Sequence, residues 1–136
     1  MTLAVNAFGT TLAMDGVTIA EVTNIGGPTL ARDAIDATHH TSPGAWREFI
    51  KGLKDAGEVS VDIQYIPTNT SHNTATTGLL SDFADNTTIS TFTLTFPDTT
   101  VWTFPGFLTA FEPGMPIDDK LTASVTIKVS GAPTLA

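Results

Sequence analysis

Strict alternation of apolar and polar residues is the feature that most limits how this chain can fold. From Leu121 to Val129 every second residue is apolar, and the residues between them are Thr, Ser, Thr and Lys. The same pattern covers Glu58 to Ile66 and Thr91 to Phe96. Because successive side chains of a strand point to opposite faces, each segment predicts a strand with one buried and one wet face. Twenty-five of the 136 residues are Thr, which favours the same conclusion because β-branched residues suit strands.

Three further segments are expected to be extended. Val17 to Ile25 reads as one strand that Gly26-Gly27-Pro28 ends, and Thr29 to Thr38 resumes the extended pattern. Val101 to Phe111 is rich in aromatic residues, but Pro105-Gly106 inside it indicates an edge strand or a bulge.

The two ends read as arms on a single domain of residues 1–136. Residues 1–16 form an N-terminal arm that ends in Asp15-Gly16, a hairpin-type turn, and residues 130–136 form a C-terminal tail. No composition shift or linker divides the chain. The prediction is a mainly β protein, an antiparallel β-sandwich or partial barrel of six or seven strands with one flanking α-helix.

That helix is expected between Ser71 and Asn86. Leu79, Leu80 and Phe83 would form its apolar stripe, and Thr76 or Thr77 would cap its start. Trp102 and Phe104 are expected to cover the helix as part of the core.

Residues 39–57 form a flap whose conformation the sequence leaves open. Four apolar residues in it lie at helical spacing, namely Trp46, Phe49, Ile50 and Leu53. Gly52 and Gly57 permit either a short helical turn or an extended flap. These side chains are too apolar for an exposed loop, so they either contact a neighbouring subunit or pack on the chain's own core.

Charge and composition exclude several classes of function. Fourteen acidic residues against six Lys and Arg give a net charge of −8, which excludes electrostatic capture of nucleic acid. The absence of Cys excludes disulfides and thiolate metal sites. We expect a soluble chain without a secretory signal or membrane insertion, since no apolar stretch is long enough.

Residues that could carry chemistry are few. His39-His40 with Asp36 resembles a ligand set, but neighbouring side chains of an extended segment point apart. His72 is distant in sequence, so solvated loop histidines are the expectation, and Asp118-Asp119 reads as a turn. No nucleophile elbow, phosphate loop or zinc spacing occurs. We therefore expect no catalytic residue, no metal, no cofactor and no enzyme activity.

One run of motifs carries a resemblance to a known family. Gly27-Pro28 is followed by Ile35-Asp36-Ala37-Thr38, Ser42-Pro43-Gly44, Glu48 to Leu53, Asp55 to Val59 and Tyr65-Ile66-Pro67. This order resembles the major tail tube proteins of long-tailed bacteriophages with flexible, non-contractile tails, and of related gene-transfer particles. The later helix and Thr-rich strands agree with it.

The resemblance implies a structural virion protein of the phage tail, assembled in the host cytoplasm. Six copies would close a ring-shaped β-barrel, and stacked rings would form the tube through which DNA passes into the host. The other implied partners are the tape-measure, tail-terminator and distal tail or baseplate proteins. Alternatives are the tube of a contractile tail or type VI secretion system, and a head-decoration or adhesin-like β-sandwich.

Two sets of residues follow for such an assembly. The flap residues Trp46, Phe49, Ile50 and Leu53 are the candidates for the contact between subunits or rings. Polar positions on the alternating segments are the candidates for the lumen, where a negative wall would repel DNA instead of adsorbing it; these are Asp33, Asp62, Thr122, Ser124 and Thr126.

Overall fold

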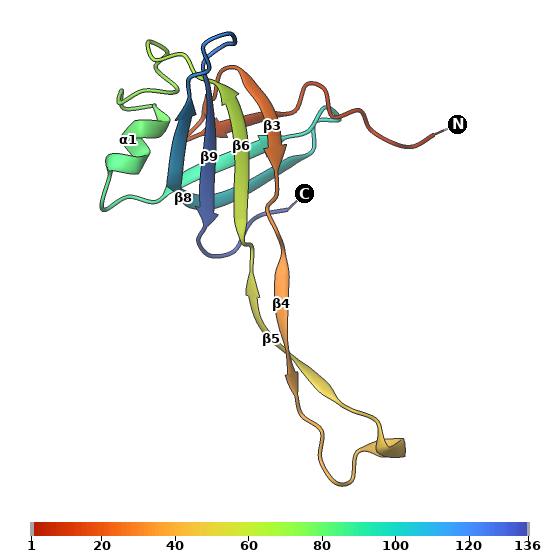
Figure 1. The fold of residues 1–136 in the computed structure, drawn as a ribbon. Helices are drawn as coiled ribbons and strands as arrows, with labels where there is room; N and C mark the ends of the chain where they lie inside the picture. The colour runs from red at the N-terminus through yellow and green to blue at the C-terminus, as the bar shows by residue number, and fades with distance from the viewer. Residues whose placement is uncertain (1, 136) are drawn as a thin grey trace.

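The computed structural model describes residues 2–135 and contains nine strands, one α-helix and one 3₁₀ turn in that range (Figure 1). Seven strands form one antiparallel sheet in the order β2-β1-β7-β8-β9-β6-β3, and β4 and β5 form a separate hairpin. The strands are β1 (Thr11–Met14), β2 (Val17–Thr18), β3 (Val22–Gly26), β4 (Ala31–Asp36), β5 (Phe49–Asp55), β6 (Glu58–Gln64), β7 (Ser90–Thr95), β8 (Val101–Gly114) and β9 (Thr122–Val129).

The seven-stranded sheet folds over itself into a two-layer sandwich. In Figure 1 one layer holds β3, β6, β9 and the second half of β8, and the strands of the other layer cross behind it. The long strand β8 belongs to both layers, because β7 pairs with Val101–Gly106 and β9 pairs with Gly106–Gly114. The predicted antiparallel sandwich with one flanking helix is confirmed.

A bulge in β8 lets the strand turn from one layer into the other. The register with β9 shifts between Leu108 and Ala110, so core-facing residues change from even numbers (Phe104, Leu108) to odd ones (Phe111). The expectation of an edge strand or a bulge in this segment is confirmed in part: the bulge lies between Leu108 and Ala110 and not at Pro105-Gly106, and β8 after Gly106 pairs on one side only. Pro105 is tolerated in β8 because its carbonyl accepts the N–H of Ser130, which lies just beyond the end of β9. The ladder between β8 and β9 therefore needs no N–H from Pro105.

The core lies between the layers and is built by the alternating strands. In β6 and β9 every predicted inward residue is buried: Val59, Val61, Ile63, Ala123, Val125, Ile127 and Val129. Phe92 and Phe104 stack across β7 and β8 with ring centroids 5.7 Å apart. The alternation of apolar and polar residues therefore predicted β6 and β9 correctly.

The N-terminal part of the chain differs from the expectation. The predicted arm of residues 1–16 contains β1, which pairs with both β2 and β7. The Asp15-Gly16 turn between β1 and β2 is confirmed, and both residues have positive φ as a tight hairpin turn requires. The single strand expected over 17–25 is instead two strands, because the chain turns at Glu21, whose φ is 56°.

The helix is much shorter than the range 71–86. Helix α1 spans Leu79–Ala84, and Gly78 is its N-cap without a side-chain bond, so Thr76 and Thr77 do not cap it. The residues before it form turns because the side-chain oxygen of Asn73 accepts the N–H of Ala75, which competes with a helix. A Cβ at Gly78 would lie 1.8 Å from the Asn73 carbonyl oxygen, so only glycine fits this approach.

Helix α1 is fastened to the sheet by a buried carboxylate. Asp82 accepts hydrogen bonds from the hydroxyl of Ser90 and, at 3.0 Å, from the N–H of Leu108 at the β8 bulge. Phe104 shares the buried core with Leu79 of the helix, as expected, whereas Trp102 packs edge-on against Phe96. No helix in residues 2–135 is both long and apolar enough to cross a membrane.

His72 is fully buried, so its prediction as a solvated loop histidine was wrong. The Ile66 N–H donates to Nδ1 at 3.1 Å, which leaves the hydrogen on Nε2, and Nε2–H donates to the Ala20 carbonyl at 2.6 Å. The imidazole therefore joins three loop segments at one end of the sandwich, a structural role.

Candidate assembly interface

The β4–β5 hairpin projects away from the sandwich as a long ribbon (Figure 1). Its strands pair from Ala31↔Asp55 to Asp36↔Phe49, and a 3₁₀ turn at Pro43–Ala45 closes the tip. The projecting segment is thus residues 31–55, so it begins earlier than the expected flap of residues 39–57. Trp46 to Lys54 is extended and not a helical turn, which decides between the two conformations left open by the sequence.

The hairpin exposes large apolar side chains. Leu53 is 85% exposed, Trp46 77%, and Phe49 and Ile50 56% each. The alternative that these residues pack on their own subunit's core is therefore wrong. Since monomeric proteins rarely present so much apolar surface on one projecting element, these side chains form a candidate interface.

Both faces of the ribbon are apolar. Ile50 is directly opposite Ile35 on one face, and its neighbour Phe49 points to the other face. The register shifts between Arg32 and Ala34, so this alternation does not continue to Leu53. The helical spacing in the sequence would have placed the four residues on one side, but the strand divides them. A ribbon that is apolar on both faces needs cover on both.

Hydrogen bonds at the tip hold the ribbon in shape. Ser42 donates to a carboxylate oxygen of Glu48 at 2.7 Å and accepts the His39 N–H at 3.0 Å. The His39 Nε2 lies 3.2 Å from the same Glu48 oxygen, so His39 belongs to this network. The Trp46 ring lies against Gly44, where an added Cβ would be 2.9 Å from the indole. The tip therefore presents Trp46 in a defined position.

Asp36, which the sequence places near His39 and His40, contacts other residues. The Asp36 carboxylate accepts the Thr38 N–H at 2.9 Å and meets Arg47 at 3.5 Å. The hydrogen bonds from Thr38 lower the pKa of Asp36. Within residues 2–135 no group of three or more His, Asp and Glu side chains is placed to hold a metal ion.

Charge is divided unevenly between the hairpin and the sandwich. Residues 31–55 hold four of the six Lys and Arg and four of the 14 Asp and Glu, so the hairpin is neutral. The remaining chain holds two cations and ten acidic residues. The whole net charge of −8 therefore belongs to the rest of the chain.

A row of polar residues crosses the outer face of one sandwich layer. Strand pairing sets Asn24, Asp62, Ser124 and Glu112 side by side across β3, β6, β9 and β8. The Ser124 hydroxyl donates to Asp62 at 3.2 Å. Lys128 is the only cation on these four strands, and its Nζ lies 3.3 Å from an Asp55 oxygen. This face therefore carries acidic groups and no free cation.

Four of the five predicted lumen residues lie on this face. Asp62, Thr122, Ser124 and Thr126 are all on the outer side of β6 and β9, opposite the buried positions. Asp33 does not join them, because it lies on the projecting ribbon. Glu112 was missed, since the sequence pattern placed a bulge at Pro105-Gly106 and not after Leu108, where it turns Glu112 to this face.

The same layer has two free edges. Strand β3 ends the strand order, and the part of β8 after Gly106 pairs with β9 on one side only. In the other layer the outermost strand, β2, has only two residues. Free edges of useful length thus bound the layer that carries the polar row, and free edges invite pairing with another chain.

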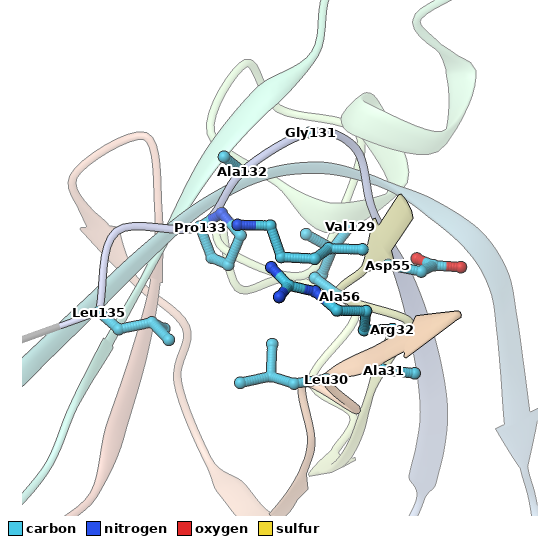
Figure 2. A pocket seen from close by; sticks show the side chains of 11 residues that line it. Leu30, Ala31, Arg32, Asp55, Ala56, Val129, Gly131, Ala132, Pro133 and Leu135 are labelled. Carbon is cyan, nitrogen blue, oxygen red and sulfur yellow. The ribbon is translucent and has the colours of Figure 1, made fainter. Parts of the chain in front are cut away.

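A hollow of about 580 Å³ lies where the hairpin leaves the sandwich (Figure 2). Its apolar walls include Leu30, Val129, Pro133 and Leu135, and Figure 2 shows the Arg32 side chain extending between Leu30 and Pro133. Lys54, the strand partner of Arg32, also lines it. The C-terminal tail forms one wall, held by a bridge between Thr134 and Thr103.

Comparison with solved structures shows what class of fold this is. The chain is similar to a subunit in the tail of an empty gene transfer agent particle with C6 symmetry (TM-score 0.77, 16% identity, 98% of this chain and 99% of that one). It is also similar to a chain in the virion of a native gene transfer agent (TM-score 0.79, 18% identity, 98% and 99%). A third match is in the sheath–tube complex of an extracellular contractile injection system, PVC (TM-score 0.76, 10% identity, 100% and 95%). The fold is that of subunits of tail and injection assemblies.

The family is shown by sequence. The chain belongs to the lambda phage tail tube protein family, whose sequence model matches residues 3–136. It is thus a structural component of a virion tail. No curated protein matches the chain significantly.

Proposed function

We propose that six copies of this chain close into a ring and that rings stack into a tube through which DNA passes. In each subunit the layer of β3, β6, β9 and the second half of β8 faces the bore. The observation that carries this assignment is the polar row from Asn24 to Glu112, on the layer that has two free edges. The C6 symmetry of the similar gene transfer agent tail supports the number six.

Ring closure would join the two free edges. Strand β3 of one subunit would pair with the Phe107–Gly114 part of β8 in the next, a head-to-tail contact that closes on itself. Four strands from each of six subunits give about 24 strands, and at about 4.8 Å spacing and 40° tilt the backbone diameter is on the order of 45 Å. A barrel of that size keeps an open bore.

The acidic face suits passage without capture. Asp62 and Glu112 flank Ser124, and the single cation of the face is held by Asp55. DNA would meet repulsion within about 10 Å of this wall at 0.1 M salt and would find no cation to displace its counterions. The DNA would therefore slide along the bore.

The hairpin would join neighbouring subunits and rings. Seven residues of β5 extend about 20 Å, enough to reach beyond the subunit's own ring. Its two apolar faces would be covered by two neighbouring copies. Because the hairpin is neutral, it would contact the negatively charged sandwiches of neighbouring subunits without net charge repulsion. At the ends of the tube we propose contacts with tape-measure, terminator and distal tail or baseplate proteins.

The sheet assignment is tested by cysteine labelling, because the natural chain has no Cys. Ser124→Cys places a thiol on the proposed lumen face, and Thr91→Cys, the matched control, places one on the exposed outer face of β7. In assembled tubes a bulky polyethylene-glycol maleimide should label Thr91→Cys and spare Ser124→Cys, while a small maleimide labels both. The reverse protection would refute the assignment.

A further inference from the structure

The hollow at the base of the hairpin combines apolar walls with two cations that lack partners. Arg32 and Lys54 are directly opposite each other in the β4–β5 ladder, and like charges at such a position repel. Among residues 2–135 no carboxylate lies within ion-pair distance of either, and the nearby Asp55 is bound to Lys128. The site is therefore built to receive a group that is apolar and acidic together.

One other segment of the chain has the complementary chemistry. The loop between β8 and β9 exposes Ile117 completely and Met115 at 74%, and Asp118 and Asp119 follow directly. Asp119 is 3.7 Å from Lys120, whereas Asp118 makes no ion pair in the described chain. By contrast, residues 2–10 of the N-terminal arm expose Leu3, Val5 and Phe8 but carry no charged side chain.

The loop and the hollow lie at opposite ends of the sandwich. The loop leads into Thr122, the first residue of β9, while Val129, the last residue of β9, lines the hollow. Eight residues of strand separate them by about 25 Å, so the loop cannot enter the hollow of its own subunit. Figure 1 shows the loop at the end of the sandwich away from the hairpin.

We propose that the Met115–Asp119 loop of one copy docks into the Arg32–Lys54 hollow of a second copy in the adjacent ring. Ile117 enters between the apolar walls, and Asp118 pairs with the two cations. This contact joins one end of the sandwich to the opposite end of the next, so it repeats without closing, as a stacked tube requires. The inference rests on the proposed stacking of rings and names a second contact, apart from the hairpin, that holds rings together.

The first test is a designed crosslink in a chain with no natural cysteine. Leu30 is half exposed and lines the hollow, so Leu30→Cys and Ile117→Cys are combined in one chain and oxidised after tubes have formed. Each chain then carries both halves of the contact, and a non-reducing gel should show a ladder that continues beyond six subunits. The matched controls are the two single variants, which can give nothing larger than dimers.

Each result of the crosslink has one meaning. A ladder that stops at six subunits would place the contact within a ring and overturn the proposal, and so would unlinked monomers from tubes that microscopy shows to be intact. If the wild-type chain itself forms no tubes at any concentration, the proposed function fails, and the docking fails with it.

A second test does not depend on the cysteine variants. Lys54→Glu and Asp118→Lys should each raise the protein concentration needed for tube formation, and the combined variant should restore it. If each contact binds about twofold more weakly, the equilibrium constant for adding a ring falls about sixty-fold, because six contacts act together. Asp98→Lys, the same charge change in the β7–β8 turn, is the control. An equal shift from Asp98→Lys, or no rescue in the combined variant, would overturn the pairing.

Discussion

Replacing Trp46 with Ala separates assembly from folding. Trp46 is 77% exposed at the hairpin tip and touches the chain chiefly through the turn at Gly44. Removing it from the monomer should therefore change the free energy of unfolding by less than about 0.5 kcal/mol, as for other surface substitutions. In the assembled tube a neighbouring copy would cover the Trp46 indole, so its loss should weaken assembly.

The size of the assembly effect follows from the area involved. A buried aromatic side chain covers about 150–250 Å², and at about 25 cal/mol per Å² its burial stabilises by roughly 4–6 kcal/mol. Ala retains part of this, so the variant should lose about 2–4 kcal/mol per contact, which corresponds to roughly 30- to 700-fold in the assembly equilibrium.

The assay has two arms. Sedimentation and negative-stain microscopy over a concentration series measure assembly, and thermal unfolding by circular dichroism measures the monomer. Trp46→Phe keeps most of the apolar area and should assemble almost normally. A Trp46→Ala chain that assembles at the wild-type concentration would refute the interface, and one whose monomer is strongly destabilised would refute the separation of assembly from folding.

Three further predictions concern other parts of the chain. His72→Ala should lower the free energy of unfolding by about 2–4 kcal/mol in urea titrations, because it empties a buried site and leaves two partly buried backbone groups without partners; a loss under 0.5 kcal/mol would contradict the bridging role. Hydrogen bonding by the Gly57 N–H, and then Lys128, lowers the pKa of Asp55. Its stabilisation is present above the unfolded pKa and is lost as the pH falls through the lower folded pKa, so melting temperatures of wild type and Asp55→Asn should converge as pH drops below about 4. A constant difference would count against this. Asp62→Lys should slow DNA ejection from assembled particles, and an unchanged ejection rate would contradict the sliding wall.

The strands that bury one face could be predicted from sequence because burial of every second side chain requires apolar and polar residues to alternate. In β6 and β9 each residue lies in the middle of the sheet, so its side is decided by the core. The break of the first strand could not be foreseen, since Glu21 adopts positive φ without a glycine to announce it. A bulge was expected in β8, but not its position after Leu108, which decides that Glu112 joins the polar face.

The helix was overestimated because residues near it hydrogen-bond locally. Asn69 and Asn73 each accept a backbone N–H two residues ahead, which holds the chain in turns until Gly78. His72 within this stretch looked like a loop residue, but its burial depends on the partners Ala20 and Ile66, and only the first of these is distant in sequence.

The candidate interface was visible in the sequence as apolar residues without a core to join. Which partner covers them could not be read, because the helical spacing of Trp46, Phe49 and Leu53 fits a core-packed turn as well as a projecting ribbon. The structure decides this by leaving them exposed on a hairpin. The hollow was beyond prediction, since it joins the hairpin base to the C-terminal tail.

A cryo-electron microscopy reconstruction of assembled tubes tests the central claim most directly. The account predicts six subunits per ring, with β3 of one paired to the second half of β8 in the next, and with Asp62 and Ser124 facing the bore. Tubes whose bore is lined instead by the outer face of β1 and β7, or chains that remain monomers at every concentration, would contradict it.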